Sequence, residues 1–275
     1  MTTPRRADRD AKPVELPRRW HWLLRGFRKY AVRYIRKHFH ALRVSKTSAP
    51  FPPPTEPVLI VMNHPAWWDP LVGLVLSREF ADRDQFAAID AVAVKQYGFF
   101  KRLGFVGVDT TSLRGAAEFL RVGRTLLSQA GRVFWVTAQG RFSDVRERPL
   151  GLRSGVGHLA AGLERGAVVP LAVEYPFWNE RAPEALARFG EPLRIADHPG
   201  LTGKEWTQRI EDALTRTLDG LNAEAISRDP VKFTELVCGG TGVGGVYDLW
   251  RRLRAWARGE RFDASHDAAT RKERP

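Results

Sequence analysis

Short apolar runs alternate with helix-like spacings through the middle of the chain. The runs predict strands at 57–63, 86–93, 104–108, 132–137, 168–174 and, less clearly, 189–194. Apolar residues three and four positions apart predict helices at 70–80, 95–102, 113–130, 153–165 and 203–226. Such alternation predicts a single α/β domain, over residues 51–228, with a largely parallel sheet flanked by helices.

Residues 16–44 have the pattern of an amphipathic helix. Its apolar stripe is Trp20, Leu23, Leu24, Phe27, Ala31, Tyr34, Ile35, His38 and Leu42. Lys and Arg side chains occupy the other side of the helix. A stripe flanked by cations and aromatic rings suits the headgroup region of an anionic membrane. The alternative is a helix that packs on the domain and leaves its cationic face in water.

A similar pattern ends the chain. Residues 246–258 place Leu, Val and Trp on one helical face and Arg on the other, so we expect a second amphipathic helix there. The glycine-rich stretch at 239–245 predicts a hinge rather than a phosphate loop, because no Lys-Ser or Lys-Thr pair follows it. We therefore divide the ends into a disordered lead-in (1–15), an interfacial helix with a linker (16–50), and a hinge with a basic helix and tail (229–275).

Charge sharpens this division. The 275-residue chain has a net charge of +13, and residues 1–50 hold fourteen Lys and Arg against three Asp and Glu. The near-neutral middle does not favour nucleic acid as a partner. The one cysteine excludes a disulfide framework and a Cys-rich zinc site. Without an apolar run of spanning length or a secretory signal, we expect a cytoplasmic protein, peripheral on the inner face of the cell membrane and without a transmembrane span.

Candidate chemistry lies at the end of the first predicted strand. His64 follows the apolar run and Asp69 comes five residues later. An aspartate at one imidazole nitrogen fixes the tautomer and leaves the other nitrogen as a general base. On spacing alone, a metal-binding pair and a helix-capping aspartate are equally good interpretations.

Four blocks in order resemble the glycerolipid acyltransferases, the 1-acylglycerol-3-phosphate acyltransferase-like family. Residues 63–69, Asn-His-Pro-Ala-Trp-Trp-Asp, are similar to its first block, His-x4-Asp. Residues 104–109 resemble the second block and 136–143 stand at the place of the third, Phe-Pro-Glu-Gly-Thr-Arg. The strand at 169–173 opens with Val-Pro, as the fourth block does.

The resemblance implies transfer of a fatty acyl group from acyl-CoA or acyl-carrier protein to a hydroxyl or amine of a lysophospholipid or related membrane lipid. His64 would be the general base and Asp69 would orient it. No metal and no cofactor is implied, because the acyl donor is a co-substrate. The membrane surface would be reached through residues 16–44 and 246–258.

Other matched or neighbouring positions are candidates for substrate binding: Trp67, Trp68, Asp109, Arg114, Gln139, Gly140, Arg141 and Arg153. The chain departs from the family pattern at three points. Gln139 replaces the third-block Glu, Phe142 stands where its Arg is expected, and Thr110 follows Asp109 in place of Arg. These departures put a simple lysophosphatidate acceptor in doubt.

Three alternatives stay open. The same fold could acylate an acceptor that is not a glycerophosphate, such as an aminolipid or a glycosylated isoprenoid. The chain could be a catalytically degenerate protein that only binds membranes. The third alternative, a nucleic-acid-binding protein, is supported by the basic N-terminal segment alone.

Overall fold

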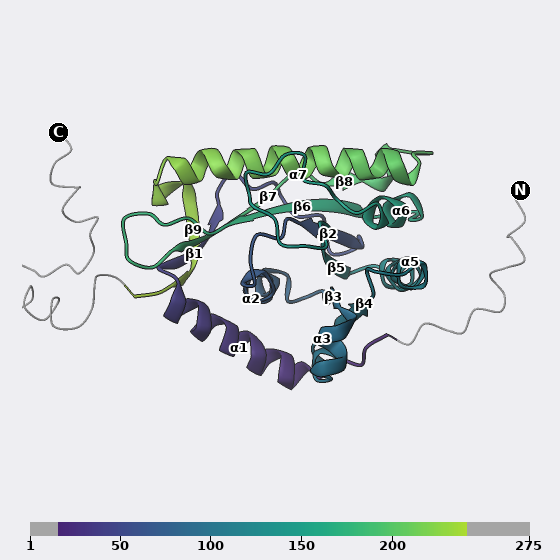
Figure 1. Ribbon diagram of the computed structural model, residues 1–275, viewed down its shortest axis with the longest axis horizontal. Helices are drawn as coiled ribbons and strands as arrows, with labels where there is room; N and C mark the ends of the chain where they lie inside the picture. Colours follow the sequence, from purple (N-terminus) through teal and green to yellow (C-terminus); the bar gives the residue numbers. More distant parts are fainter. Residues whose placement is uncertain (1–15, 241–275) are drawn as a thin grey trace, which may run out of the picture.

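One mixed sheet with helices on both faces forms the body of the protein (Figure 1). The computed structural model describes residues 16–240. In those residues the strands follow the order β4-β3-β5-β2-β6-β7-β1-β9, and β8 pairs with β6. The strands are β1 (Ala41–Ser45), β2 (Val58–Met62), β3 (Asp84–Asp90), β4 (Phe105–Val108), β5 (Arg132–Thr137), β6 (Ala167–Glu174), β7 (Glu184–Phe189), β8 (Leu193–Arg194) and β9 (Phe233–Cys238).

Helices cover the sheet in two layers. Figure 1 shows α7 along one face, with α1 and α2 on the opposite side. A capping box starts α7, where the Thr202 hydroxyl and the Glu205 carboxylate each bind the other's main chain. The α-helices are α1 (His21–His38), α2 (Asp69–Leu76), α3 (Ala91–Gln96), α4 (Phe100–Leu103), α5 (Leu113–Leu127), α6 (Gly155–Ala161) and α7 (Gly203–Ile226).

The first five strands in this order, from β4 to β6, confirm the largely parallel sheet. Strand β2 pairs in parallel with β5 on one side and β6 on the other, and β3 pairs in parallel with both β4 and β5. The carboxyl ends of these strands therefore meet at one edge of the sheet. In open α/β sheets this edge is where ligands bind.

Successive side chains of β2 point to opposite faces of the sheet and so belong to two separate core clusters. Leu59 and Val61 belong to a cluster with α5, α6 and α7, whereas Val58, Ile60 and Met62 belong to the cluster under α1 and α2. All five residues of β2 are buried. A strand covered on both faces explains why this segment is a continuous apolar run in the sequence.

The predicted helix over 16–44 is wrong at its end. Helix α1 stops at His38 because Phe39 is extended, and Ala41–Ser45 form strand β1 between β7 and β9. Leu42 fits both the helical stripe and the strand, so periodicity alone could not separate them. Strand β9 was also missed, and the sheet extends beyond both ends of the 51–228 range.

Three smaller boundaries also differ. The strand predicted at 86–93 ends at Asp90, whose carboxylate accepts the Val92 N–H at 2.7 Å and starts α3. The helix predicted at 95–102 is divided into α3 and α4. The strand predicted at 189–194 is replaced by β7, which ends at Phe189, and the short β8.

A buried ionic cluster fastens β1 to its neighbours. Glu184 of β7 binds His40 Nδ1 at 2.5 Å and Arg43 Nε at 3.1 Å, and Arg43 also pairs with Glu235 of β9 at 2.9 Å. The hydrogen bond to Glu184 raises the pKa of His40. The basic segment before residue 50 is thus tied to the sheet by charges that neutralise one another.

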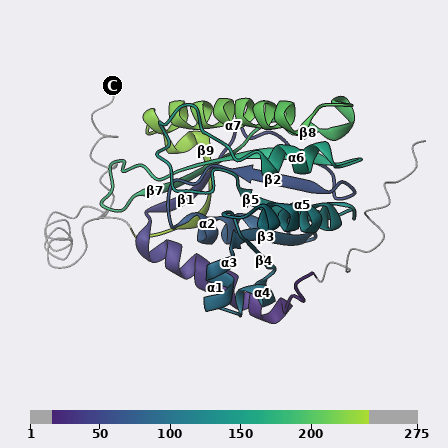
Figure 2. The same cartoon turned by 45° about the vertical axis from the view of Figure 1, so that its right-hand side comes forward.

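The apolar stripe of α1 is buried against the body of the protein. Leu24, Ala31 and Ile35 are buried in the cluster with α2, and Figure 2 shows α1 lying along the side of the domain. Most of the stripe is therefore not free to enter a bilayer, whereas Trp20 at its start is exposed. No helix in residues 16–240 is both long and apolar enough to cross a membrane. The expected lead-in at 1–15 and helix at 246–258 lie outside the described residues.

Candidate active site

The site is built on the turn between β2 and α2. His64 follows the end of β2, and Asp69 is the first residue of α2. His64 Nδ1 lies 2.5 Å from Asp69 Oδ2, and the Ala66 N–H donates to the same oxygen at 3.3 Å. Asp69 is 1% exposed. A buried carboxylate at Nδ1 holds the proton there and leaves Nε2 as the basic nitrogen.

Tyr175 completes the environment of Asp69. Its hydroxyl donates to Asp69 Oδ1 at 2.5 Å, so each carboxylate oxygen has a side-chain partner. Burial, followed by the charge of Asp69, raises the pKa of Tyr175 well above its ordinary value, which keeps the phenol protonated as a donor. From the sequence, Tyr175 belongs to an aromatic segment after the fourth-block strand that either lines an acceptor pocket or forms a buried corner, and its hydrogen bond to Asp69 is not expected. The available signal was its place, directly after the fourth-block strand β6 and so at the edge that carries His64.

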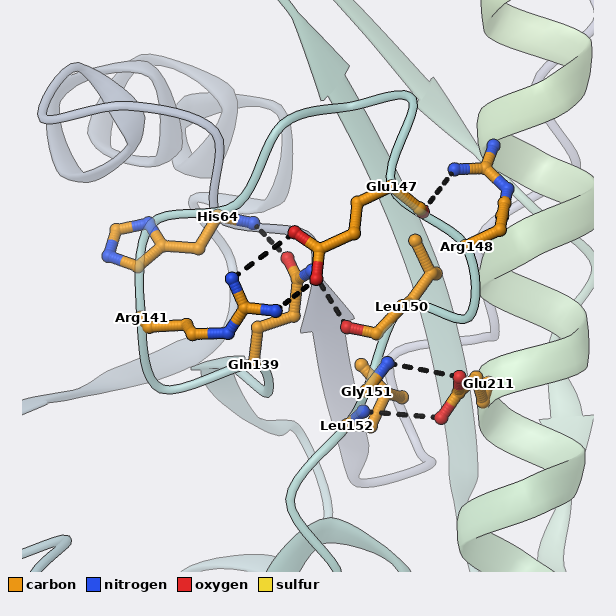
Figure 3. Close-up of polar contacts among 9 residues, drawn as sticks. All are labelled: His64, Gln139, Arg141, Glu147, Arg148, Leu150, Gly151, Leu152 and Glu211. Atoms are coloured by element: carbon orange, nitrogen blue, oxygen red, sulfur yellow. Dashed lines mark hydrogen bonds and ion pairs between the residues drawn. The ribbon is translucent and has the colours of Figure 1, made fainter.

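Gln139 holds the main chain of His64. Its Oε1 accepts the His64 N–H at 2.8 Å, and its Nε2 donates to the Leu150 carbonyl at 3.0 Å (Figure 3). The side chain is buried and is absent from the lining of both cavities described below. The expected substrate contact by Gln139 is therefore not what the structure shows.

Two cavities meet at His64. An apolar cavity of about 210 Å³ lies between α1, α2 and the sheet, with Met62, Leu74, Phe105 and Trp135 in its wall. A larger and more polar groove of about 670 Å³ runs over α5 and the segment after β5. His64 lines both, so one imidazole faces an apolar and a polar compartment.

Asp109 and Gly140 both line the polar groove. The Asp109 carboxylate accepts from Thr111 and Ser112 at the start of α5, and these hydrogen bonds lower its pKa to about 2. Asp109 therefore stabilises the turn that leads into α5 and also lines the groove. Gly140 has φ +64°, and a side chain there would collide with Arg153, so glycine lets the arginine cross the turn.

The groove's arginines differ in availability. Arg141 is paired with Glu147, as Figure 3 shows. Arg153 donates to the Thr110 carbonyl at 2.8 Å, and within residues 16–240 it forms no ion pair with a carboxylate. Arg153 is therefore the better placed cation for an anionic substrate group.

The remaining candidates lie elsewhere. Trp67 is exposed, whereas Trp68 packs edge-on against Phe39 at 4.8 Å. Arg114 is exposed in the first turn of α5. None of these three lines either cavity. The structure does not bring them to His64 as substrate contacts.

Phe142 lies beside His64, at the position where the family pattern has a cation. Its ring centroid is 4.5 Å from that of His64, and the side chain is 58% exposed in the groove. The structure thus places an aromatic surface next to the basic nitrogen. The metal interpretation of the His64–Asp69 spacing gains no support, since no group of three potential ligands occurs in the described part of the chain.

Comparison with known proteins identifies the family. Residues 40–174 match the family model described as Acyltransferase, a span that contains His64, Asp69 and Gln139. Residues 40–174 therefore form an acyltransferase domain. No curated protein sequence matches it.

The fold of this acyltransferase is similar to a solved structure. The 1-acyl-sn-glycerophosphate acyltransferase PlsC of Thermotoga maritima aligns with a TM-score of 0.52 at 14% identity, over 74% of this chain and 80% of that one. The likeness confirms the single α/β domain with its mostly parallel sheet. The match to the family model confirms that the chain is an acyltransferase.

We predict that Tyr175→Phe lowers the kcat of the acyltransferase about tenfold. The change leaves Asp69 Oδ1 buried without its donor, a loss that is typically worth 1–3 kcal/mol. Because Tyr175 lines neither cavity, the KM for the acyl donor should stay within about twofold of the wild-type value. Steady-state kinetics measures both constants, and thermal unfolding checks that the variant is folded at the assay temperature. An unchanged kcat would show that Asp69 needs no second partner.

Proposed function

We propose that this acyltransferase moves a fatty acyl group from a thioester, acyl-CoA or acyl-carrier protein, to a hydroxyl or amine of a membrane lipid. The acceptor's oxygen or nitrogen attacks the thioester carbonyl, and His64 Nε2 takes the proton from that attacking atom. The C–S bond breaks, and the departing sulfur receives the proton from His64. Asp69 stabilises the imidazolium between these steps. The observation that carries the proposal is the Asp69-bound imidazole at the junction of the two cavities.

The apolar cavity suits the acyl chain. Its wall is formed mainly by aliphatic and aromatic side chains, and a methyl group at Gly73 of α2 would meet only open space. An acyl chain placed there has its carbonyl end at His64. The polar groove then receives the headgroup of the acceptor and the polar part of the donor, near Arg153.

The hydrogen bonds around Asp69 favour an enzyme over a degenerate membrane-binding protein. Burying a carboxylate is costly unless it is paired and hydrogen-bonded. Here the whole arrangement of His64, Asp69 and Tyr175 is assembled around one buried charge. A protein that only bound membranes would have no physical need for it.

We predict that His64→Ala abolishes acyl transfer while the chain stays folded. The test incubates purified protein with a labelled acyl donor and a total lipid extract, and mass spectrometry identifies the labelled product. Loss of the base removes a contribution of about 10²–10⁴ to the rate. The control Gln129→Glu, in an exposed turn after α5, should keep the wild-type rate. Wild-type turnover in His64→Ala would refute the proposed mechanism.

Phe142 favours an acceptor without a phosphate beside the reacting hydroxyl. A phosphate needs cations or hydrogen-bond donors, and an exposed phenyl ring at the base provides neither. Three neighbouring arginines are already paired: Arg141 with Glu147, Arg146 with Asp144 and Arg148 with Asp219. Arg153, which is not paired with a carboxylate within residues 16–240, is then assigned to the anionic part of the acyl donor. We therefore propose an uncharged or amino-bearing lipid acceptor in preference to lysophosphatidate.

We predict that the wild-type enzyme uses monoacylglycerol or a lyso-aminolipid at least tenfold better than lysophosphatidate, by kcat/KM. Phe142→Arg should raise kcat/KM for lysophosphatidate several-fold, because it places a cation in the groove next to His64. The matched variant Phe142→Leu, which is apolar but not cationic, should leave that preference in place. A wild-type preference for lysophosphatidate would contradict the proposed acceptor class.

The membrane contact is proposed for the outer side of α1 and its surroundings. Ring-to-ring contacts run from Tyr97 through Phe99, Phe27, Tyr30 and Tyr34 to Trp67. We call the exposed members of this row, together with Trp22, the aromatic row: Trp22, Tyr30, Trp67, Tyr97 and Phe99. Exposed Arg25, Lys29 and Arg33 stand on the same helix. Each such cation adds about 1 kcal/mol of attraction to an anionic surface.

We predict that the double variant Trp22→Ala/Tyr30→Ala weakens binding to anionic phosphatidylglycerol vesicles at least fivefold, because it removes exposed rings that favour the interface. Vesicle co-sedimentation measures the affinity. Ile226→Ala is the matched control, since Ile226 is exposed at the end of α7 on the opposite side of the sheet. Tighter binding of the wild type to DNA than to vesicles at moderate salt would favour the nucleic-acid alternative.

A further inference from the structure

We propose that Gln139 is a positioning residue, whose neutral amide fixes the main chain of His64 and cannot be replaced by a carboxylate without a loss of activity above neutral pH. The proposal rests on the general-base role of His64 given above. It adds a requirement that the family pattern does not contain, since the corresponding third-block residue there is Glu.

The amide bridges two main-chain groups of opposite polarity. Oε1 faces a donor, the His64 N–H, and Nε2 faces an acceptor, the Leu150 carbonyl. Gln139 is 3% exposed, so water does not substitute readily for either partner. Only a group with both an acceptor and a donor satisfies this pair.

Leu150 is itself held in place. The next two main-chain N–H groups, of Gly151 and Leu152, donate to the Glu211 carboxylate of α7 at 3.1 and 3.2 Å (Figure 3). The Arg153 N–H donates to the Ala138 carbonyl at 2.9 Å. The carbonyl that receives the Gln139 amide therefore belongs to an anchored segment, and it cannot turn away at low cost.

The chain just after Gln139 binds the other polar main-chain group of His64, its carbonyl. The Ser143 N–H donates to the His64 carbonyl at 3.0 Å. Both main-chain groups of the histidine are thus bound from the 139–143 segment. A shift of this segment moves the imidazole relative to both cavities, and displacements of about 1 Å can cost on the order of a hundredfold in rate.

An ionised Glu at position 139 would face the Leu150 carbonyl with an acceptor and would bury a charge. Protonation restores the pattern, because the carboxylic acid donates through one oxygen and accepts through the other. Burial raises the pKa of such a carboxyl group. Gln139→Glu is thus expected to be a pH-dependent defect, close to the wild type when the acid is protonated and impaired when it is ionised.

The first experiment measures kcat for Gln139→Glu and the wild type between pH 5.5 and 9. Dividing the kcat of the variant by that of the wild type at each pH cancels the pH dependence that both enzymes have in common. We expect the ratio to fall at least tenfold as pH rises, with the KM for the acyl donor within about twofold. Gln129→Glu, which adds the same charge at an exposed position, should give a flat ratio. A flat ratio for Gln139→Glu would overturn the proposal.

The second experiment does not depend on turnover. Gln139→Leu removes both hydrogen bonds and adds no charge. We expect the His64 amide to exchange with solvent at least tenfold faster in this variant than in the wild type, as measured by NMR. The kcat of Gln139→Leu should fall at least tenfold at every pH, without the slope seen for Gln139→Glu.

Equal exchange of the His64 amide in the wild type and Gln139→Leu would overturn the proposal, and so would an unchanged kcat. These outcomes are separate from a failure of the proposed function. If the wild type transferred no acyl group to any lipid, the exchange experiment would still decide whether Gln139 holds His64.

Discussion

The site depends on one constraint, the burial of β2 between two parallel neighbours. Because β5 and β6 flank β2 in parallel register, the residues that follow all three strands emerge at one edge. His64 follows β2, Gln139 follows β5 and Tyr175 follows β6. Strand pairing thus brings together three residues that lie far apart in the sequence. They are His64, the proposed general base, Gln139, which holds its main chain, and Tyr175, which holds the Asp69 carboxylate.

Around this edge, neutral groups support a single buried charge. Asn63 binds the main chain of Val173 in both directions, donating to its carbonyl at 2.9 Å and accepting its N–H at 2.8 Å. This pair continues the link between β2 and β6 past the end of β2 and leads the chain into the turn. Asp69 then has donors from His64, Tyr175 and the Ala66 main chain. A buried carboxylate with both oxygens bound is held in one orientation and so fixes the orientation of the imidazole.

Features set by local pattern were predictable from the sequence. The strand at 132–137 and the helix at 203–226 have the predicted bounds, because a continuous apolar run and a long periodic helix are strong local signals. The contact between His64 and Asp69 was predictable because the two residues lie five positions apart on one turn. Strands β1 and β9 were missed because they are defined by pairing with each other and with β7, which no local pattern contains. The hydrogen bonds of Tyr175 to Asp69 and of Leu150 to Gln139 were not predicted for the same reason, since they form only when segments distant in the sequence meet.

Helix α1 takes part both in the proposed binding of the acyl chain and in the proposed contact with the membrane. Its inner side contributes Leu24 and Arg28 to the wall of the apolar cavity, and its outer side carries Trp22 and Tyr30 of the aromatic row. The stripe that the sequence suggested for a bilayer is instead part of the protein's own core. An amphipathic helix that buries its apolar stripe in the domain can still present a ring of aromatic and cationic side chains at its edge. The proposed contact with the lipid surface and the wall of the proposed acyl cavity therefore lie on one helix, so that docking on a membrane would place the cavity at a fixed height above it.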